Sequence, residues 1–108
     1  MHLITLLACA GVTLTVDNST PEPITDVSVE VTGVTYDLGT LQPGEEATVR
    51  LQPQGESSVV VLGMREGALE EVGIPVYLEG SGYQGTISVD FQPRGEALIE
   101  TDVRIGLF

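Results

Sequence analysis

Apolar and polar residues alternate along most of the chain with a period of two. Valines alternate with polar residues in the segment 27–31, and the segments 12–16 and 86–91 follow the same pattern. The segment 99–105 repeats it, with isoleucine, threonine and valine on one side and charged residues on the other. Successive side chains of a β-strand point to opposite faces of a sheet, so this alternation predicts strands with one buried face.

Proline and glycine interrupt these runs at short intervals. The segments 42–45, 52–56 and 92–96 each start with Gln-Pro and end with Gly-Glu. Because proline presets the φ angle of a turn and glycine accepts a positive one, we expect all three to be hairpin connections. A repeated binding motif is the alternative interpretation of these segments. About seven to eight short strands joined by turns predict an all-β fold, an immunoglobulin-like antiparallel β-sandwich.

Four features of the second half depart from simple alternation. The continuous apolar run 57–64 predicts a fully buried strand. The polar segment 65–71 predicts a turn, with a single helical turn as the alternative. Pro75 lies within an apolar strand pattern, and because proline donates no backbone hydrogen bond, we expect that strand at a sheet edge or with a bulge. The glycine-rich segment 80–85 predicts a loop.

Three segments of the first half carry a resemblance to a known family. They are the strand end 16–18, which closes on Asp-Asn, the alternating strand 24–31, and the Leu-Gln-Pro-Gly-Glu turn 41–45. This layout resembles the bacterial immunoglobulin-like sandwich domains of the adhesion-related, CARDB-like type. The resemblance implies a β-sandwich and covers the first half of the chain. That family has no shared catalytic residues, so the resemblance implies no catalytic site.

The N-terminal segment is apolar and contains no charged residue from Leu3 to Val16. One interpretation is a signal peptide, in which the segment 6–9 is a lipoprotein cleavage box and Cys9 is the acylated residue. A second is a membrane anchor, although the segment is shorter than the roughly 20 residues that span a bilayer. A third is a strand, which the alternation from Val12 to Val16 favours.

We therefore divide the chain into two parts. Residues 1–10 are an apolar lead-in that we expect to pack against another surface, and residues 11–108 are a single β-sandwich domain. That surface could belong to its own domain, to a neighbouring protein in a larger assembly or to a membrane, and we prefer the larger assembly. The candidate contact residues of the lead-in are Leu3, Ile4, Leu6 and Leu7.

The net charge limits the partners of the chain. Sixteen Asp and Glu residues oppose four basic residues, which gives a formal net charge of −12 at pH 7. Nucleic acids and anionic lipid headgroups bind clustered cations, so we expect no nucleic-acid partner and disfavour an anionic lipid surface. High solubility is the simplest consequence of this acidity, and a salty habitat or a cationic partner are the alternatives.

The sequence offers little material for nucleophilic catalysis. The single histidine, His2, and the single cysteine, Cys9, both lie in the apolar lead-in. A thiol among aliphatic side chains behaves as a small hydrophobic group, and a Cys-His pair would need an extended and exposed lead-in. We therefore expect that the protein is not an enzyme. One cysteine also excludes a disulfide bond within the chain.

Carboxylates are the remaining candidates for a functional site. The segments 45–46 and 70–71 each hold two glutamates, but adjacent strand residues point to opposite faces and do not converge. Asp17, Glu22 and Asp26 could supply oxygen ligands for calcium, but they lack the spacing of an EF-hand loop, and zinc ligands are missing. We expect solvated surface charges here, with no metal and no cofactor.

Two functions are consistent with these observations. We prefer a non-catalytic structural or accessory interaction module that joins protein partners outside the cytoplasm, in the periplasm or at the cell surface. The alternative is a carbohydrate- or ligand-binding module of a secreted protein or lipoprotein, which needs exposed aromatic side chains. Tyr83 in the glycine-rich loop is the candidate contact residue, with a packed loop anchor as its structural alternative. Tyr36 and Tyr77 are the other aromatic candidates for such a platform.

Overall fold

The computed structural model describes residues 11–51, 56–79 and 83–105, and they form eight strands and one short 3₁₀ turn. Within these ranges no helix is long and apolar enough to cross a membrane. The elements are β1 (Gly11–Asn18), β2 (Ile24–Val31), β3 (Val34–Leu41), β4 (Glu46–Leu51), β5 (Glu56–Arg65), β6 (Ala68–Glu79), β7 (Tyr83–Gln92), η1 (Pro93–Gly95) and β8 (Glu96–Ile105).

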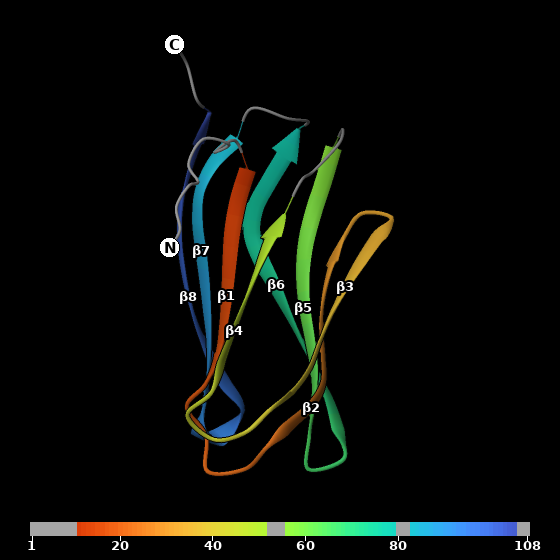
Figure 1. The fold of residues 1–108 in the computed structure, drawn as a ribbon, viewed down its shortest axis with the longest axis vertical. Coiled ribbons are helices and arrows are strands. Elements are labelled where there is room, and N and C mark those ends of the chain that lie inside the picture. The colour runs from red at the N-terminus through yellow and green to blue at the C-terminus, as the bar shows by residue number, and fades with distance from the viewer. Residues whose placement is uncertain (1–10, 52–55, 80–82, 106–108) are drawn as a thin grey trace, which may run out of the picture.

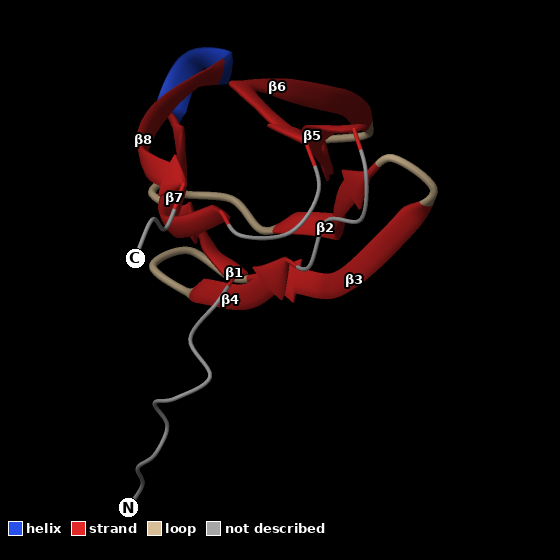
Figure 2. Cartoon of the chain, turned by 90° about the horizontal axis from the view of Figure 1, so that it is seen from above, coloured by secondary structure: helices blue, strands red, loops and turns tan. Residues whose placement is uncertain are grey.

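The strands form two four-stranded sheets that pack against each other (Figure 1, Figure 2). The first sheet has the strand order β4-β1-β7-β8, and the second has the order β3-β2-β5-β6. The predicted all-β sandwich is confirmed. One pairing differs from the wholly antiparallel prediction, because β1 and β7 run parallel, with Leu14 beside Ile87 and Val16 beside Val89.

The core lies between the two sheets and is built from the apolar side of each alternating strand. Every second residue is buried in the segments 12–16, 27–31 and 87–91 of β1, β2 and β7, which confirms the predicted phase of these strands. Most core side chains are valine, leucine or isoleucine, and Phe91 is the largest fully buried one. The fully buried aliphatic residues are Val12, Leu14, Val16, Ile24, Val27, Val29, Leu51, Val59, Val61, Ile87 and Val89.

The three Gln-Pro segments do not play the same role. The segment 92–96 is a hairpin as predicted, because Gln92 at the end of β7 pairs with Glu96 at the start of β8. The hairpin prediction is wrong for 42–45, because β3 and β4 lie in different sheets. The segment 52–55 lies outside the described residues, but the strands on either side of it, β4 and β5, also belong to different sheets. Proline and glycine therefore mark the bend here without fixing which sheet the chain enters.

The hairpin of β5 and β6 corrects two further predictions. The apolar run is not fully buried, because Val60, Leu62 and Met64 are half-buried on the outer face of the second sheet. The predicted turn shortens to Glu66 and Gly67, with φ angles of 53° and 79°, and β6 starts directly after it. Two positive φ angles are what a tight two-residue hairpin turn requires, so the chain reverses without a helical turn.

The prediction for Pro75 is confirmed in both its forms. Strand β6 is an edge strand of the second sheet. Its register with β5 also shifts at this residue, since Ser58 pairs with Tyr77 and Val59 pairs with Ile74. The bulge accommodates the proline, which cannot donate a hydrogen bond to the neighbouring strand.

Candidate functional site

The sequence-predicted site residues fall mostly beyond the described part of the chain. Leu3, Ile4, Leu6, Leu7 and Cys9 all lie outside it. Tyr83 is the first residue of β7, where its backbone pairs with Ile105, so the predicted glycine-rich loop is shorter than expected. The lead-in is followed directly by β1, which is bonded to β4 on one side and to β7 on the other.

A buried arginine joins the two sheets at the end of the sandwich where β5 turns into β6. Arg65 is 7% exposed, and its Nε and Nη2 donate hydrogen bonds of 2.7 and 2.8 Å to the two carboxylate oxygens of Glu70. Its Nη1 donates a 2.6 Å bond to the carbonyl oxygen of Gln92, which belongs to the other sheet. This paired arrangement places a fixed positive charge inside the molecule without leaving it uncompensated.

Arg65 and Glu70 form part of the wall of an end cleft of about 470 Å³. Three segments that are distant in the sequence line the cleft, namely the loop before β2, the β5–β6 turn and the β7–β8 turn. Its other lining residues are Pro21, Glu22, Glu66, Ala68, Pro93, Arg94 and Gly95. Prolines and mixed charges suit a polar or charged group of a ligand, and loops at one end of a sandwich are common contact surfaces.

At the same end of the sandwich, the side chain of Asn18 fixes the end of β1. Asn18 is 1% exposed. Its Nδ2 donates to the carbonyl oxygens of Glu22 and Leu41 at 2.8 and 2.9 Å. Its Oδ1 accepts hydrogen bonds from the backbone nitrogen and the hydroxyl of Thr20 at 2.9 and 2.7 Å. All four hydrogen-bonding positions of the amide are therefore used, and they tie β1, the following loop and β3 together.

The turn 41–45 packs onto this asparagine. The backbone nitrogen of Asn18 donates to the carbonyl oxygen of Glu45 at 3.0 Å, and Gly44 donates back to the carbonyl oxygen of Asn18 at 2.8 Å. The carboxylate of Glu45 accepts a 2.7 Å bond from the backbone nitrogen of Gln42. The residues that carried the family resemblance are thus brought into contact, and their role is to hold the sandwich together.

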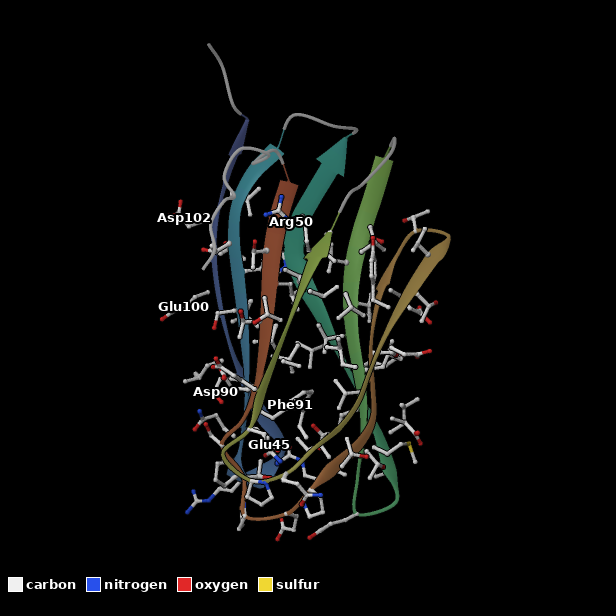
Figure 3. All side chains as sticks on the ribbon, in the orientation of Figure 1. Glu45, Arg50, Asp90, Phe91, Glu100 and Asp102 are labelled. Carbon is white, nitrogen blue, oxygen red and sulfur yellow. The ribbon has the colours of Figure 1, made fainter. Side chains whose placement is uncertain are left out.

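Three carboxylates form a row across the outer face of the first sheet. Asp17 on β1 pairs with Glu46 on β4 and with Asp90 on β7. We call these three residues the acidic row. Asp90 accepts hydrogen bonds of 2.6 and 2.7 Å from Ser19 and Gln92. Figure 3 shows Asp90 pointing away from the sandwich, whereas Phe91, the next residue, points between the sheets.

The pKa of Asp17, the central residue of the acidic row, is raised by its surroundings. Burial raises the pKa of Asp17 from 3.8 to about 6, and the hydrogen bond with Glu46 and the negative charges of Glu46 and Asp90 add to the rise. Like charges on adjacent strands disfavour the ionised form of the group between them. Asp17 therefore changes its charge at mildly acidic pH.

The carboxylates that sequence reasoning considered for calcium do not share one sheet. Asp17 lies on β1 in the first sheet, Asp26 lies on β2 in the second, and Glu22 lies in the loop between them. Across residues 11–51, 56–79 and 83–105, His, Cys, Asp and Glu side chains form no group of three that could hold a metal ion.

A model of one protein family matches most of the chain. This family is described as a domain of unknown function, DUF8725, and the match covers residues 6–99. The chain belongs to this family. The DUF8725 match begins within the lead-in, so residues 6–10 fall inside the matched region. Comparison with curated proteins finds no match in sequence.

Two solved structures share the fold of this DUF8725 domain. The NMR structure of a protein from Eubacterium rectale has a TM-score of 0.57 and 14% sequence identity, covering 84% of this chain and 87% of that one. The crystal structure of a Bacteroides ovatus protein with a suggested role in cell adhesion has a TM-score of 0.53 and 12% identity. The alignment covers 93% of this chain and 46% of that protein, so this chain spans less than half its length. At these identities the likeness shows the fold.

Sequence reasoning missed both the buried arginine and the acidic row of this DUF8725 domain. A signal for Arg65 was present, because it has the same period-two phase as Val59, Val61 and Gly63, which are all buried. The acidic row carried no comparable signal, since Asp17, Glu46 and Asp90 are far apart in the chain. Only the register of β1 with β4 and β7 brings them together.

Proposed function

We propose that this DUF8725 domain is a non-catalytic interaction module of an extracytoplasmic assembly, to which it docks through the apolar lead-in, residues 1–10. The observation that carries the proposal is the position of β1. This strand follows the lead-in without a linker and is bonded on both sides in the first sheet. A surface that binds the lead-in would therefore hold the whole sandwich through a central strand of its first sheet.

The fold of the neighbours supports the same kind of function. The Bacteroides ovatus protein, which shares the fold, has a suggested role in cell adhesion, and adhesion takes place at the cell surface. A net charge of −12 keeps such a module soluble and apart from its copies except where an uncharged segment makes contact. In this proposal the lead-in is that segment, and a protein partner or a membrane is the surface that receives it.

The experiment is fractionation of native cells followed by intact-mass measurement. We expect the full-length chain in a large complex or a membrane fraction, resistant to a high-salt wash and released by detergent at unmodified mass. The variant Leu6→Glu/Leu7→Glu should move to the soluble pool as a free chain. Val34→Glu, a change at a 51% exposed apolar residue of β3, is the matched control and should stay bound. Recovery of the unaltered chain as a free monomer would refute the docking role, and a diacylglyceryl mass on Cys9 would replace it with a lipid anchor.

A second candidate function rests on the end cleft. Its volume of about 470 Å³ would fit part of a sugar or a peptide. Its lining residues include no aromatic side chain, so binding here would depend on polar and charged contacts and not on the aromatic platform expected from the sequence. The alternative is therefore a carbohydrate- or ligand-binding module of a secreted protein. If this alternative holds, an added glycan or peptide should shift the NMR amide resonances of Glu22, Glu66 and Arg94 in the cleft. Shifts confined to other faces of the sandwich would count against it.

A further inference from the structure

The edge strand β8 differs from the other three sheet edges. A strand at a sheet edge leaves half of its backbone donors and acceptors unpaired, and natural edges are usually short, bulged, interrupted by proline or lined with charged side chains. Of these devices, β8 has only the charged side chains, such as Glu100 and Asp102. Here β4 has only six residues, β3 faces a register shift in its pairing with β2, and β6 has the bulge at Pro75. Strand β8 has ten residues and pairs with β7 in unbroken register, without a proline.

The inward side of β8 is also incompletely covered. Ala97, Ile99 and Val103 pack against the core but are only partly buried, and Thr101 between them is exposed. Strands β6 and β8 border the same side of the sandwich and approach each other over part of their length, but they belong to different sheets and do not pair (Figure 2). Among the described strands, only β7 is hydrogen-bonded to β8, so one further strand could pair along its other edge and cover these apolar side chains.

The chain itself contains a segment that fits this edge. Residues 1–10 in extended form would span about 33 Å, which is long enough to run beside β8. The lead-in contains no proline, no glycine and no carboxylate. Residues 6–10 of this segment lie within the DUF8725 match.

The geometry favours a neighbouring copy over the same chain. In the strand order, β7 and β8 separate β1 from the free edge of the first sheet. Neighbouring strands lie about 4.8 Å apart, so a lead-in leaving β1 would cross about 14 Å and use about four residues before it could pair. A second copy can receive all ten residues.

The charge pattern also favours the lead-in over the β8 strand of a second copy as the partner of β8. Glu100 and Asp102 are exposed on β8 and point away from the sandwich (Figure 3). Direct pairing of β8 with β8 of a second copy would bring these carboxylates close to their counterparts, which is unfavourable. The lead-in brings no carboxylate to this edge, so two chains of net charge −12 can join there.

We propose that the lead-in of one copy adds as a strand to the free edge of β8 in a second copy. This inference rests on the proposed function, because it names the partner surface for the same docking segment. Repetition of the contact links copies head to tail into an assembly.

The test measures the molar mass of the full-length chain by size exclusion with light scattering. We expect an assembly larger than the monomer. Leu6→Glu disables the lead-in, and Thr101→Lys places a lysine on the inward side of β8, so each variant should run as a monomer. Leu98→Lys, on the 58% exposed outward side, is a second acceptor variant in case the first fails to fold. Thr35→Lys is the matched control on the exposed edge strand β3 and should assemble normally.

Mixing the two monomeric variants gives the sharpest result. Leu6→Glu retains an intact β8, and Thr101→Lys retains an intact lead-in, so their mixture should form a heterodimer of twice the monomer mass. Failure of the mixture to associate would overturn the proposal. If both acceptor variants assemble while Leu6→Glu does not, docking through the lead-in survives and β8 is excluded as its partner. A purified chain that begins at Cys9 would refute both the pairing with β8 and the docking through the lead-in.

Discussion

The guanidinium carbon of Arg65 lies 5.8 Å from the centroid of the Phe91 ring. The arginine belongs to β5 in the second sheet, and the phenylalanine belongs to β7 in the first. A cation over an aromatic face is attracted to the ring, and this contact adds to the hydrogen bonds that Arg65 makes with Glu70 and Gln92. One side chain thus links the two sheets beside the end cleft.

Removing the partner of this arginine should cost more than removing the pair. Glu70→Ala leaves an 8% exposed guanidinium without its carboxylate, and we expect a loss of about 2–3 kcal/mol in the free energy of unfolding. Arg65→Met/Glu70→Met replaces both charges with apolar groups and should lie within about 1 kcal/mol of the parent. Urea unfolding of the three proteins checks this. A double variant no more stable than Glu70→Ala would show that the pair itself contributes the stability.

The acidic row should make the stability of the protein depend on pH. The folded state raises the pKa of Asp17 from 3.8 to about 6, so it binds this proton more tightly than the unfolded chain does. The resulting stabilisation is complete below about pH 4 and is lost as the pH rises through about 6. Because Asp17 is partly exposed, we expect about 1 kcal/mol.

The variant Asp17→Asn isolates this effect. It removes the central charge of the row, so it should be more stable than the parent at about pH 8 and should show a flatter profile between about pH 4 and 7. Asp37→Asn, at an exposed carboxylate of β3, is the control and should follow the parent. Urea midpoints at several pH values provide the measurement, and identical profiles for parent and Asp17→Asn would remove the basis of this prediction.

Asn18 should tolerate neither truncation nor a charge. Asn18→Ala leaves the carbonyl oxygens of Glu22 and Leu41 without their donor, with an expected loss of about 3 kcal/mol. Asn18→Asp turns a carboxylate oxygen toward these same carbonyls, so it should be destabilised at neutral pH and partly recover when the carboxyl is protonated. Thermal unfolding at two pH values distinguishes the variants. If the difference in stability between Asn18→Asp and the parent is the same at both pH values, this account is contradicted.

Three glycines should respond differently to alanine. A Cβ on Gly85 would overlap the backbone carbonyl oxygen of Asp102, and its φ angle of 139° is unfavourable for alanine, so Gly85→Ala should disrupt the pairing of β7 with β8. A Cβ on Gly63 would lie 2.8 Å from Cγ2 of Ile24, with an expected cost of about 1–3 kcal/mol. Gly73 has no atom within 4 Å of such a Cβ, so Gly73→Ala should be neutral or stabilising by up to about 1 kcal/mol. Unfolding midpoints rank the three, and a different order would refute this reading.

The fold could be predicted where local chemistry determines it. Alternation placed the buried faces of β1, β2 and β7 correctly, and Pro75 correctly marked an edge and a bulge. Turn residues were less informative, because Pro43 and Gly44 bend the chain but do not decide whether the next strand joins the same sheet. That choice depends on contacts such as the hydrogen bonds between Asn18 and the turn 41–45, which are distant in sequence.

The candidate site was harder to predict than the fold. The ion pair of Arg65 with Glu70 lies inside a segment that looked like a polar turn, and only the phase of β5 indicates that the arginine is buried. The acidic row depends on strand register over long sequence separations. The lead-in remains a sequence-based prediction, since its residues lie outside the described part of the chain.

The parallel contact of β1 with β7 has a consequence for how the protein is made. These strands, Gly11–Asn18 and Tyr83–Gln92, are separated by most of the chain, so β1 cannot acquire its central place until the ribosome has synthesised nearly all of it. Folding of such long-range pairings is slow, because a large loop must close before the contact forms. The strands of the second sheet all precede β7 in the chain and can pair earlier, so the two-sheet sandwich should be completed only at the end of synthesis.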